Sequence, residues 1–172
     1  NKLARSKVLA KDMPFATLDP TMRAIRSPSG RKILLSDTVG FITDLPTELI
    51  AAFRATLEEV READILVHVR DVSDPDHEGR KADVEAVLDA LDAGAEHGQF
   101  MIEAWNKADR LDEEERADLL WRARLPKRPG RPPAAVTSAV TGEGIDELMA
   151  LVERALAADD VILRLKIAPQ EA

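Results

Sequence analysis

The sequence predicts an α/β fold in three layers, with a mostly parallel sheet, one antiparallel hairpin at its edge and helices on both faces. Short β-branched runs alternate with amphipathic helical runs from residue 65 onwards, which is the order that produces a parallel sheet. The 172 residues suit one domain with its own core. Ligands of such sheets bind beyond the carboxyl ends of the strands, so polar residues at those ends are the candidates for function.

The first elements are a hairpin, a helix and a strand. Two extended runs, 24–26 and 33–35, flank the turn sequence Ser-Pro-Ser-Gly at 27–30. Apolar residues at spacings of three and four predict a helix over 48–63. The run Ile-Leu-Val-His-Val at 65–69 predicts a buried strand, and its histidine is interpreted as structural.

A second helix and strand follow. Apolar residues in helical register predict a helix over 83–91, with Gly94 as its C-cap. Residues 100–105 form the next predicted strand.

The last third of the chain predicts two helices around a strand. Asp112 and Glu115 form a capping box that opens a helix running through Leu120. Residues 134–137 are the last central strand, and 145–156 the final helix.

Composition and charge exclude several classes of protein. The net charge of −8 argues against a basic surface that grips nucleic acid, and no direct DNA binding is expected. Without cysteine, neither a disulfide nor a thiolate zinc site is possible. No apolar run is long enough to span a membrane. One basic cluster, Lys127, Arg128 and Arg131, reads first as a solvated loop, with an RNA contact as its alternative.

The most specific motif is Asn106-Lys107-Ala108-Asp109, directly after a predicted strand. The Asp109 carboxylate can accept two hydrogen bonds from the N1–H and 2-amino groups of guanine, a donor pair that adenine lacks. Asn106 can contact the base edge and hold the loop, while the Lys107 stem can lie over the ring. The alternative is a polar loop with a helix cap.

A second motif, Asp37-Thr38-Val39-Gly40, follows the strand at 33–35. An aspartate there can hold a Mg²⁺-bound water, and a glycine lets a backbone N–H approach a γ-phosphate. The alternative is an ordinary strand-to-helix turn.

A third motif ends the last strand. Backbone N–H groups at Ser138, Ala139 and Val140 can reach a carbonyl oxygen of a base. The glycines that follow, Gly142 and Gly144, read first as loop and helix-cap residues.

With these motifs in this order, the chain resembles HflX-type GTPases of the translation-factor-related class. The resemblance rests on six segments, 15–21 (Phe-Ala-Thr-Leu-Asp-Pro-Thr), 35–42 (Leu-Ser-Asp-Thr-Val-Gly-Phe-Ile), 53–60 (Phe-Arg-Ala-Thr-Leu-Glu-Glu-Val), 63–64, 106–109 and 138–139. It implies a P-loop NTPase-like G domain over 1–160, with 161–172 as a tail or the start of a further small domain.

The resemblance also implies roles for residues of the first two motifs. Nucleotide contacts in the first switch fall to Phe15, Ala16, Thr17, Leu18 and Asp19. Thr17 and Asp37 would hold Mg²⁺, and Thr17 and Gly40 would act in catalysis. Phe41 stands where many small GTPases have a water-orienting glutamine, so hydrolysis should be slow without a partner. Phe41 can equally be a core anchor.

The implied function is hydrolysis of GTP to GDP and phosphate in the cytoplasm, with Mg²⁺. The implied partner is the large ribosomal subunit, bound mainly through another domain, in order to split or rescue stalled ribosomes. A related ribosome-assembly GTPase and a non-enzymatic partner-binding module with a vestigial pocket are the alternatives. No Gly-x-x-x-x-Gly-Lys-Ser/Thr motif occurs, so we expect the chain to begin just beyond that loop and to bind GTP poorly.

Overall fold

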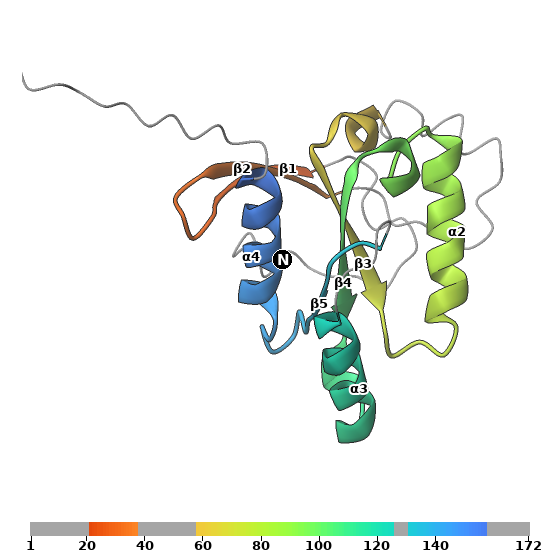
Figure 1. Cartoon of the computed structure of the whole chain (residues 1–172). Coiled ribbons are helices and arrows are strands. Elements are labelled where there is room, and N and C mark those ends of the chain that lie inside the picture. Colours follow the sequence, from red (N-terminus) through yellow and green to blue (C-terminus); the bar gives the residue numbers. More distant parts are fainter. Residues whose placement is uncertain (1–20, 38–57, 126–130, 158–172) are drawn as a thin grey trace, which may run out of the picture.

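The computed structural model describes residues 21–37, 58–125 and 131–157 (Figure 1). Of the helix predicted over 48–63, only 58–63 fall in these ranges; residues 58–62 are helical and Ala63 is not. The tail at 161–172 lies outside them. None of the helices within these ranges is long and apolar enough to cross a membrane.

The predicted hairpin is present. Strands β1 (Thr21–Arg26) and β2 (Lys32–Asp37) pair antiparallel. Its turn is closed by the amide of Ser27, which donates to the carbonyl of Arg31. Gly30 takes a φ of 87°, a conformation that favours glycine. The turn lies against the end of the final helix, where the Ser29 amide donates to Glu153.

The central sheet is parallel, as predicted. It consists of β3 (Ile65–Asp71), β4 (Phe100–Asn106) and β5 (Ala134–Val136) in the order β3-β4-β5. Among the described residues, the hairpin forms a separate two-stranded sheet. Because the three strands run in one direction, their carboxyl ends lie at the same edge of the sheet. The segments that follow Asp71, Asn106 and Val136 leave the sheet at this edge.

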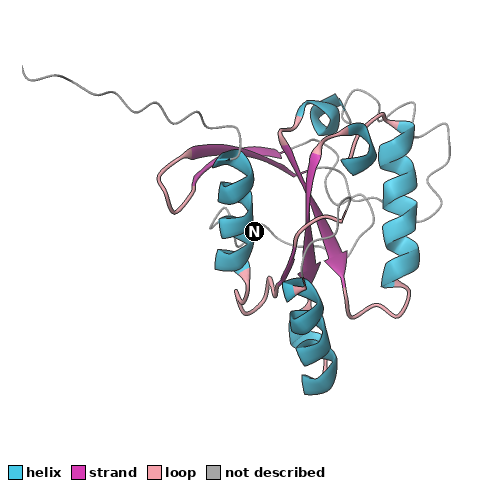
Figure 2. Ribbon diagram, in the orientation of Figure 1, coloured by secondary structure: helices cyan, strands magenta, loops and turns pink. Residues whose placement is uncertain are grey.

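Helices cover both faces of this sheet: α2 (His77–Ala90) and α3 (Glu113–Arg124) on one, α4 (Ile145–Ala157) on the other (Figure 2). Alternate β4 side chains divide between the faces. Met101 and Trp105 pack in the clusters that hold α2 and α3 side chains, whereas Ile102 and Ala104 pack against α4. The predicted three-layer α/β fold is therefore correct.

Two helix boundaries differ from their predictions by more than one residue. Helix α2 begins at His77, whereas the sequence predicted a start at residue 83. The prediction missed the first turns because their sequence, His-Glu-Gly-Arg-Lys-Ala, has no apolar periodicity. Helix α3 has the predicted Asp112–Glu115 capping box but continues to Arg124.

Gly94 is not the C-cap of α2. Leu91 holds that position, and the chain turns immediately afterwards at Asp92, whose φ is 52°. The Ala93 amide reaches back to the carbonyl of Leu88. Gly94 instead precedes a short 3-10 helix, η1 (Ala95–His97).

Candidate functional site

The segment Asn106 to Asp109 leaves the carboxyl end of β4 and is fastened to the segment that leaves β5. The Asn106 side-chain oxygen accepts a hydrogen bond of 2.9 Å from the Ala139 amide. The amide of the fully buried Ala108 donates to the Thr137 carbonyl at 3.1 Å. Two of the three predicted motifs therefore lie together at one edge of the sheet.

Asp109 lies in a second 3-10 helix, η2 (Ala108–Arg110), and its side chain is held through one of its two carboxylate oxygens. The Ser138 hydroxyl donates to its Oδ1 and accepts a hydrogen bond of 3.1 Å from the Thr141 amide. Ser138 is itself completely buried. No described residue bonds to Oδ2 of Asp109, and the residue is exposed. The carboxylate is thus oriented while one oxygen is left for a ligand.

The loop after β5 is a tight turn that depends on glycine. Its ends are joined by the Gly142 amide, which donates to the Ser138 carbonyl at 2.8 Å. Gly144 has a φ of 69°, and a Cβ at that position would lie 1.8 Å from the Val136 carbonyl oxygen. An ion pair between Arg116 and Glu143 joins the same loop to α3.

Lys107 has a left-handed backbone, with a φ of 67°, and its side chain reaches across to the end of β3. Its Nζ lies 2.6 Å from Oδ2 of Asp71. The other oxygen of Asp71 accepts hydrogen bonds from the Ser73 amide (3.1 Å) and hydroxyl (2.6 Å). Burial works to raise the pKa of Asp71, but the hydrogen bonds from Lys107 and Ser73 prevail and lower it.

Asp71 and Ser73 are site residues that the sequence reasoning missed. The available signal was an Asp-x-Ser sequence directly after an apolar strand, the composition of an Asx turn at the carboxyl end of a parallel strand. Nothing local showed that its carboxylate would face Lys107.

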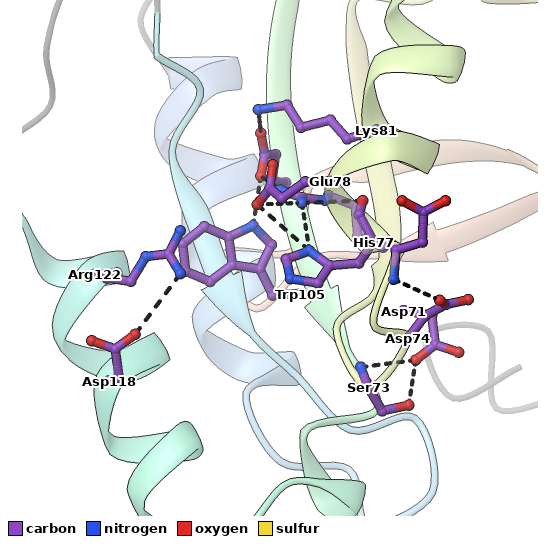
Figure 3. A network of polar contacts seen from close by, with 12 residues as sticks. Asp71, Ser73, Asp74, His77, Glu78, Lys81, Trp105, Asp118 and Arg122 are labelled. Atoms are coloured by element: carbon purple, nitrogen blue, oxygen red, sulfur yellow. Dashed lines mark hydrogen bonds and ion pairs between the residues drawn. The ribbon is translucent and has the colours of Figure 1, made fainter.

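A buried ionic network lies below this edge, on the face covered by α2 (Figure 3). Glu103 is 4% exposed. It binds Arg70 Nη1 at 2.8 Å, Lys81 Nζ at 2.9 Å and the indole N–H of Trp105. Burial opposes ionisation of Glu103, yet these three donors lower its pKa to about 2.

Arg70 carries the network from the sheet to the first turn of α2. Its Nη2 lies 2.8 Å from both His77 Nδ1 and Glu78 Oε1. Next to this network, the Nδ1 of His68 is buried and has no partner among the described residues, and burial lowers the pKa of its imidazole.

The other predicted site residues are placed less fully. Asp37 is the last residue of β2 and is exposed. Val140 is 75% exposed. The residues from Phe15 to Asp19, and Thr38, Val39, Gly40 and Phe41, lie outside the described ranges. Within those ranges, no three His, Asp or Glu side chains gather where they could hold a metal ion.

Comparison with protein families gives a match over more than half of the chain. The profile of the family described as "50S ribosome-binding GTPase" matches residues 1–107. GTPase HflX of Magnetococcus marinus is 47% identical over 156 residues, which are 91% of this chain and 34% of that protein. GTPase HflX of Escherichia coli K12 is 37% identical over 172 residues, 99% of this chain and 38% of that protein. The chain thus spans about a third of the length of these relatives.

Solved structures share the fold. A GTP-binding protein of Sulfolobus solfataricus in complex with GDP superposes with a TM-score of 0.63 at 24% identity, covering 81% of this chain and 45% of that one. Translation elongation factor SelB of Methanococcus maripaludis, in complex with a GTP analogue, gives a TM-score of 0.55 at 22% identity, over 85% of this chain and 30% of that one.

Proposed function

Since the chain belongs to the family of 50S ribosome-binding GTPases, as a G domain of the HflX type, we propose that its carboxyl edge binds the guanine base of GTP and GDP for GTP hydrolysis. One observation carries this proposal: Asp109 is oriented by Ser138 through Oδ1, and no residue of the described ranges bonds to its Oδ2.

Recognition of guanine follows from that geometry. The Asp109 carboxylate accepts from the N1–H and 2-amino groups of the base, and adenine would leave it unpaired. The backbone amides after Ser138 face the 6-oxo group. Asn106 is committed to the Ala139 amide, so its main contribution is to hold the two loops together. Lys107, held by Asp71, supplies an aliphatic stem to cover one face of the ring.

The phosphate end of the proposed site rests on the family resemblance. Thr17 and Asp37 are proposed to hold Mg²⁺, whose charge would neutralise the phosphates; a hydroxyl and an exposed carboxylate are hard oxygen ligands of the kind this ion takes. Gly40 is proposed to offer its amide to the γ-phosphate, and Thr17 and Gly40 to act in catalysis. The sequence contains no Gly-x-x-x-x-Gly-Lys-Ser/Thr motif, so we propose no residue of this chain as a donor to the other phosphates.

We further propose a cytoplasmic protein that acts on the large ribosomal subunit to split or rescue stalled ribosomes, with the basic contact surface mainly in another domain. The description of the matching family supports this partner. A ribosome-assembly GTPase is the second candidate, because the family description names the 50S subunit without naming a step.

Phosphate release from GTP by the full-length protein, with and without 50S subunits, tests the proposal. Phe41 cannot orient water, so we expect slow turnover alone and faster turnover with 50S subunits. Equal rates with and without subunits would contradict partner activation. No GTP turnover in either case would contradict the enzymatic function itself.

A further inference from the structure

The end of α3 carries an exposed tryptophan that the proposed nucleotide site does not use. Leu119 on this helix is buried, and Leu120 and Ala123 pack against the same core. Trp121 faces away from them and is 62% exposed, and Leu125 after the helix is 37% exposed. The indole is the largest apolar side chain, so its exposure at this position leaves a broad stacking surface open to solvent.

Three arginines surround this helix end. Arg124 and Arg131 are exposed, and no ion pair within the described ranges includes either of them. Arg122 lies with its guanidinium 5.8 Å from the centre of the Trp105 ring and 3.8 Å from Asp118 (Figure 3). Arg122, Leu125 and Arg131 line one hollow, so the segment before β5 brings its arginine to the end of α3.

The charge at this end is opposite to that of the chain as a whole. The described residues from Trp121 to Leu125 and at position 131 include Arg122, Arg124 and Arg131 and no acidic residue, although the net charge of the chain is −8. The acidic residues of α3 lie in its first turn and at Asp118. Cations in the last turn complement the helix dipole, which accounts for Arg122 and Arg124. It accounts neither for the exposed Trp121 nor for Arg131, which lies on another segment.

We propose that Trp121, Arg124 and Arg131 form a contact for single-stranded RNA, in which an unpaired base stacks on the indole and the guanidinium groups bind phosphates. Arginine matches phosphate oxygens with paired donors, and aromatic rings stack on any base. An acidic peptide would use the arginines and leave the ring unexplained. The choice of RNA as partner rests on the proposed ribosomal function.

Binding of an unstructured 12-nucleotide RNA to the full chain, measured by mobility shift at low salt, tests this surface. Trp121→Ala should weaken binding about tenfold, whereas Trp121→Phe, which keeps a stacking ring, should stay within about threefold. Arg124→Ala and Arg131→Ala should each reduce the slope of log K against log salt by about 0.7. Arg154→Ala, at an exposed arginine of α4, is the matched control and should change neither quantity.

Three results would overturn the proposal: no RNA binding, equal affinity for the Trp121→Ala variant, or equally tight and Trp121-dependent binding of poly-glutamate, which would make the surface a site for acidic protein. Thermal unfolding of each variant shows whether the fold is intact. GTP turnover is a separate readout: its loss with RNA binding retained contradicts the proposed enzymatic function and leaves this surface standing.

Discussion

Lys107 and Asp71 form an ion pair of 2.6 Å that joins the loop after β4 to the end of β3. The parallel register makes this possible, because Asp71 and Asn106 are paired across the two strands and Lys107 follows directly. Asp71 is fixed in turn by two hydrogen bonds from Ser73. The conformation of the proposed base-binding loop is therefore set partly by a neighbouring strand.

The Asp71→Asn variant tests whether this ion pair positions Lys107 for base binding. Without the charge, Lys107 loses a partly exposed ion pair worth up to about 1 kcal/mol, and its stem is no longer held over the base. We expect affinity for GDP, measured by calorimetry in the full-length protein, to fall by less than about tenfold. Asp74→Asn, a nearby aspartate paired with Arg80 instead, should leave it unchanged. Unaltered affinity in the Asp71 variant would show that the ion pair does not position the lysine.

Asp109→Asn should move nucleotide preference from GTP towards xanthosine triphosphate. The new amide presents a donor where guanine presents its own, whereas the 2-oxo group of xanthine accepts. Competition binding with both nucleotides measures the change, and Asp112→Asn, at the cap of α3, serves as control. If the preference stays with GTP, Asp109 does not read the base.

Glu103→Gln should destabilise the fold, because it leaves Arg70 and Lys81 beside a neutral group in a buried position. Breaking a buried ion pair costs about 3–5 kcal/mol. Urea unfolding of both proteins at pH 7 measures the difference. Glu85→Gln is the matched control, since it also contacts Lys81 but is half exposed. Similar losses of unfolding free energy in the two variants would mean that burial of the network adds nothing to stability.

The Glu103 carboxylate also makes the stability difference between the native protein and the Glu103→Gln variant depend on pH. Its pKa is lowered from 4.5 to about 2 in the folded protein, so its stabilising effect is present above the unfolded value of 4.5. It is lost as pH falls from 4.5 towards about 2. We expect the stability gap between the native protein and the Glu103→Gln variant to be constant from pH 7 to 5.5 and to narrow below pH about 4.5. A gap that narrows already between pH 7 and 5.5 would be inconsistent with this pKa.

Gly144→Ala separates a steric clash from backbone strain. At Gly144 an added Cβ meets a carbonyl oxygen at 1.8 Å, whereas at Gly98, with a φ of 82°, it meets nothing within 4 Å. Gly98→Ala should therefore cost about 1–2 kcal/mol from its left-handed backbone alone. Gly144→Ala should cost more, because the loop after β5 has to shift. Chemical denaturation decides between these outcomes, and equal losses would argue that the loop yields easily.

Where the sequence predicted correctly, the cause of the structure was local. The turn at 27–30, the Asp112–Glu115 capping box and the position of 106–109 after a strand depend on neighbouring residues. Partners fixed by strand register could not be read this way. Asp71 meets Lys107, and Glu103 meets Arg70, only because β3 and β4 align in one particular register.

Glu103 also shows why a polar residue in a strand is hard to interpret. The sequence at 100–105 reads as a strand whichever way Glu103 points, and only the arrival of Lys81 from α2 explains how its charge is buried. The first turns of α2 were missed for a related reason. Their residues serve the network through His77 and Glu78 rather than an apolar stripe.

The contrast between the two tryptophans gives the molecule an internal optical probe. Trp105, 3% exposed, directly precedes Asn106 and holds its indole N–H against Glu103, whereas Trp121 is 62% exposed. A buried, hydrogen-bonded indole emits at shorter wavelength than a hydrated one and resists quenching by solutes. In the Trp121→Phe variant, Trp105 would be the one tryptophan left among these 172 residues. Its emission would then report directly, without any attached dye, on changes at the start of the proposed base-binding loop.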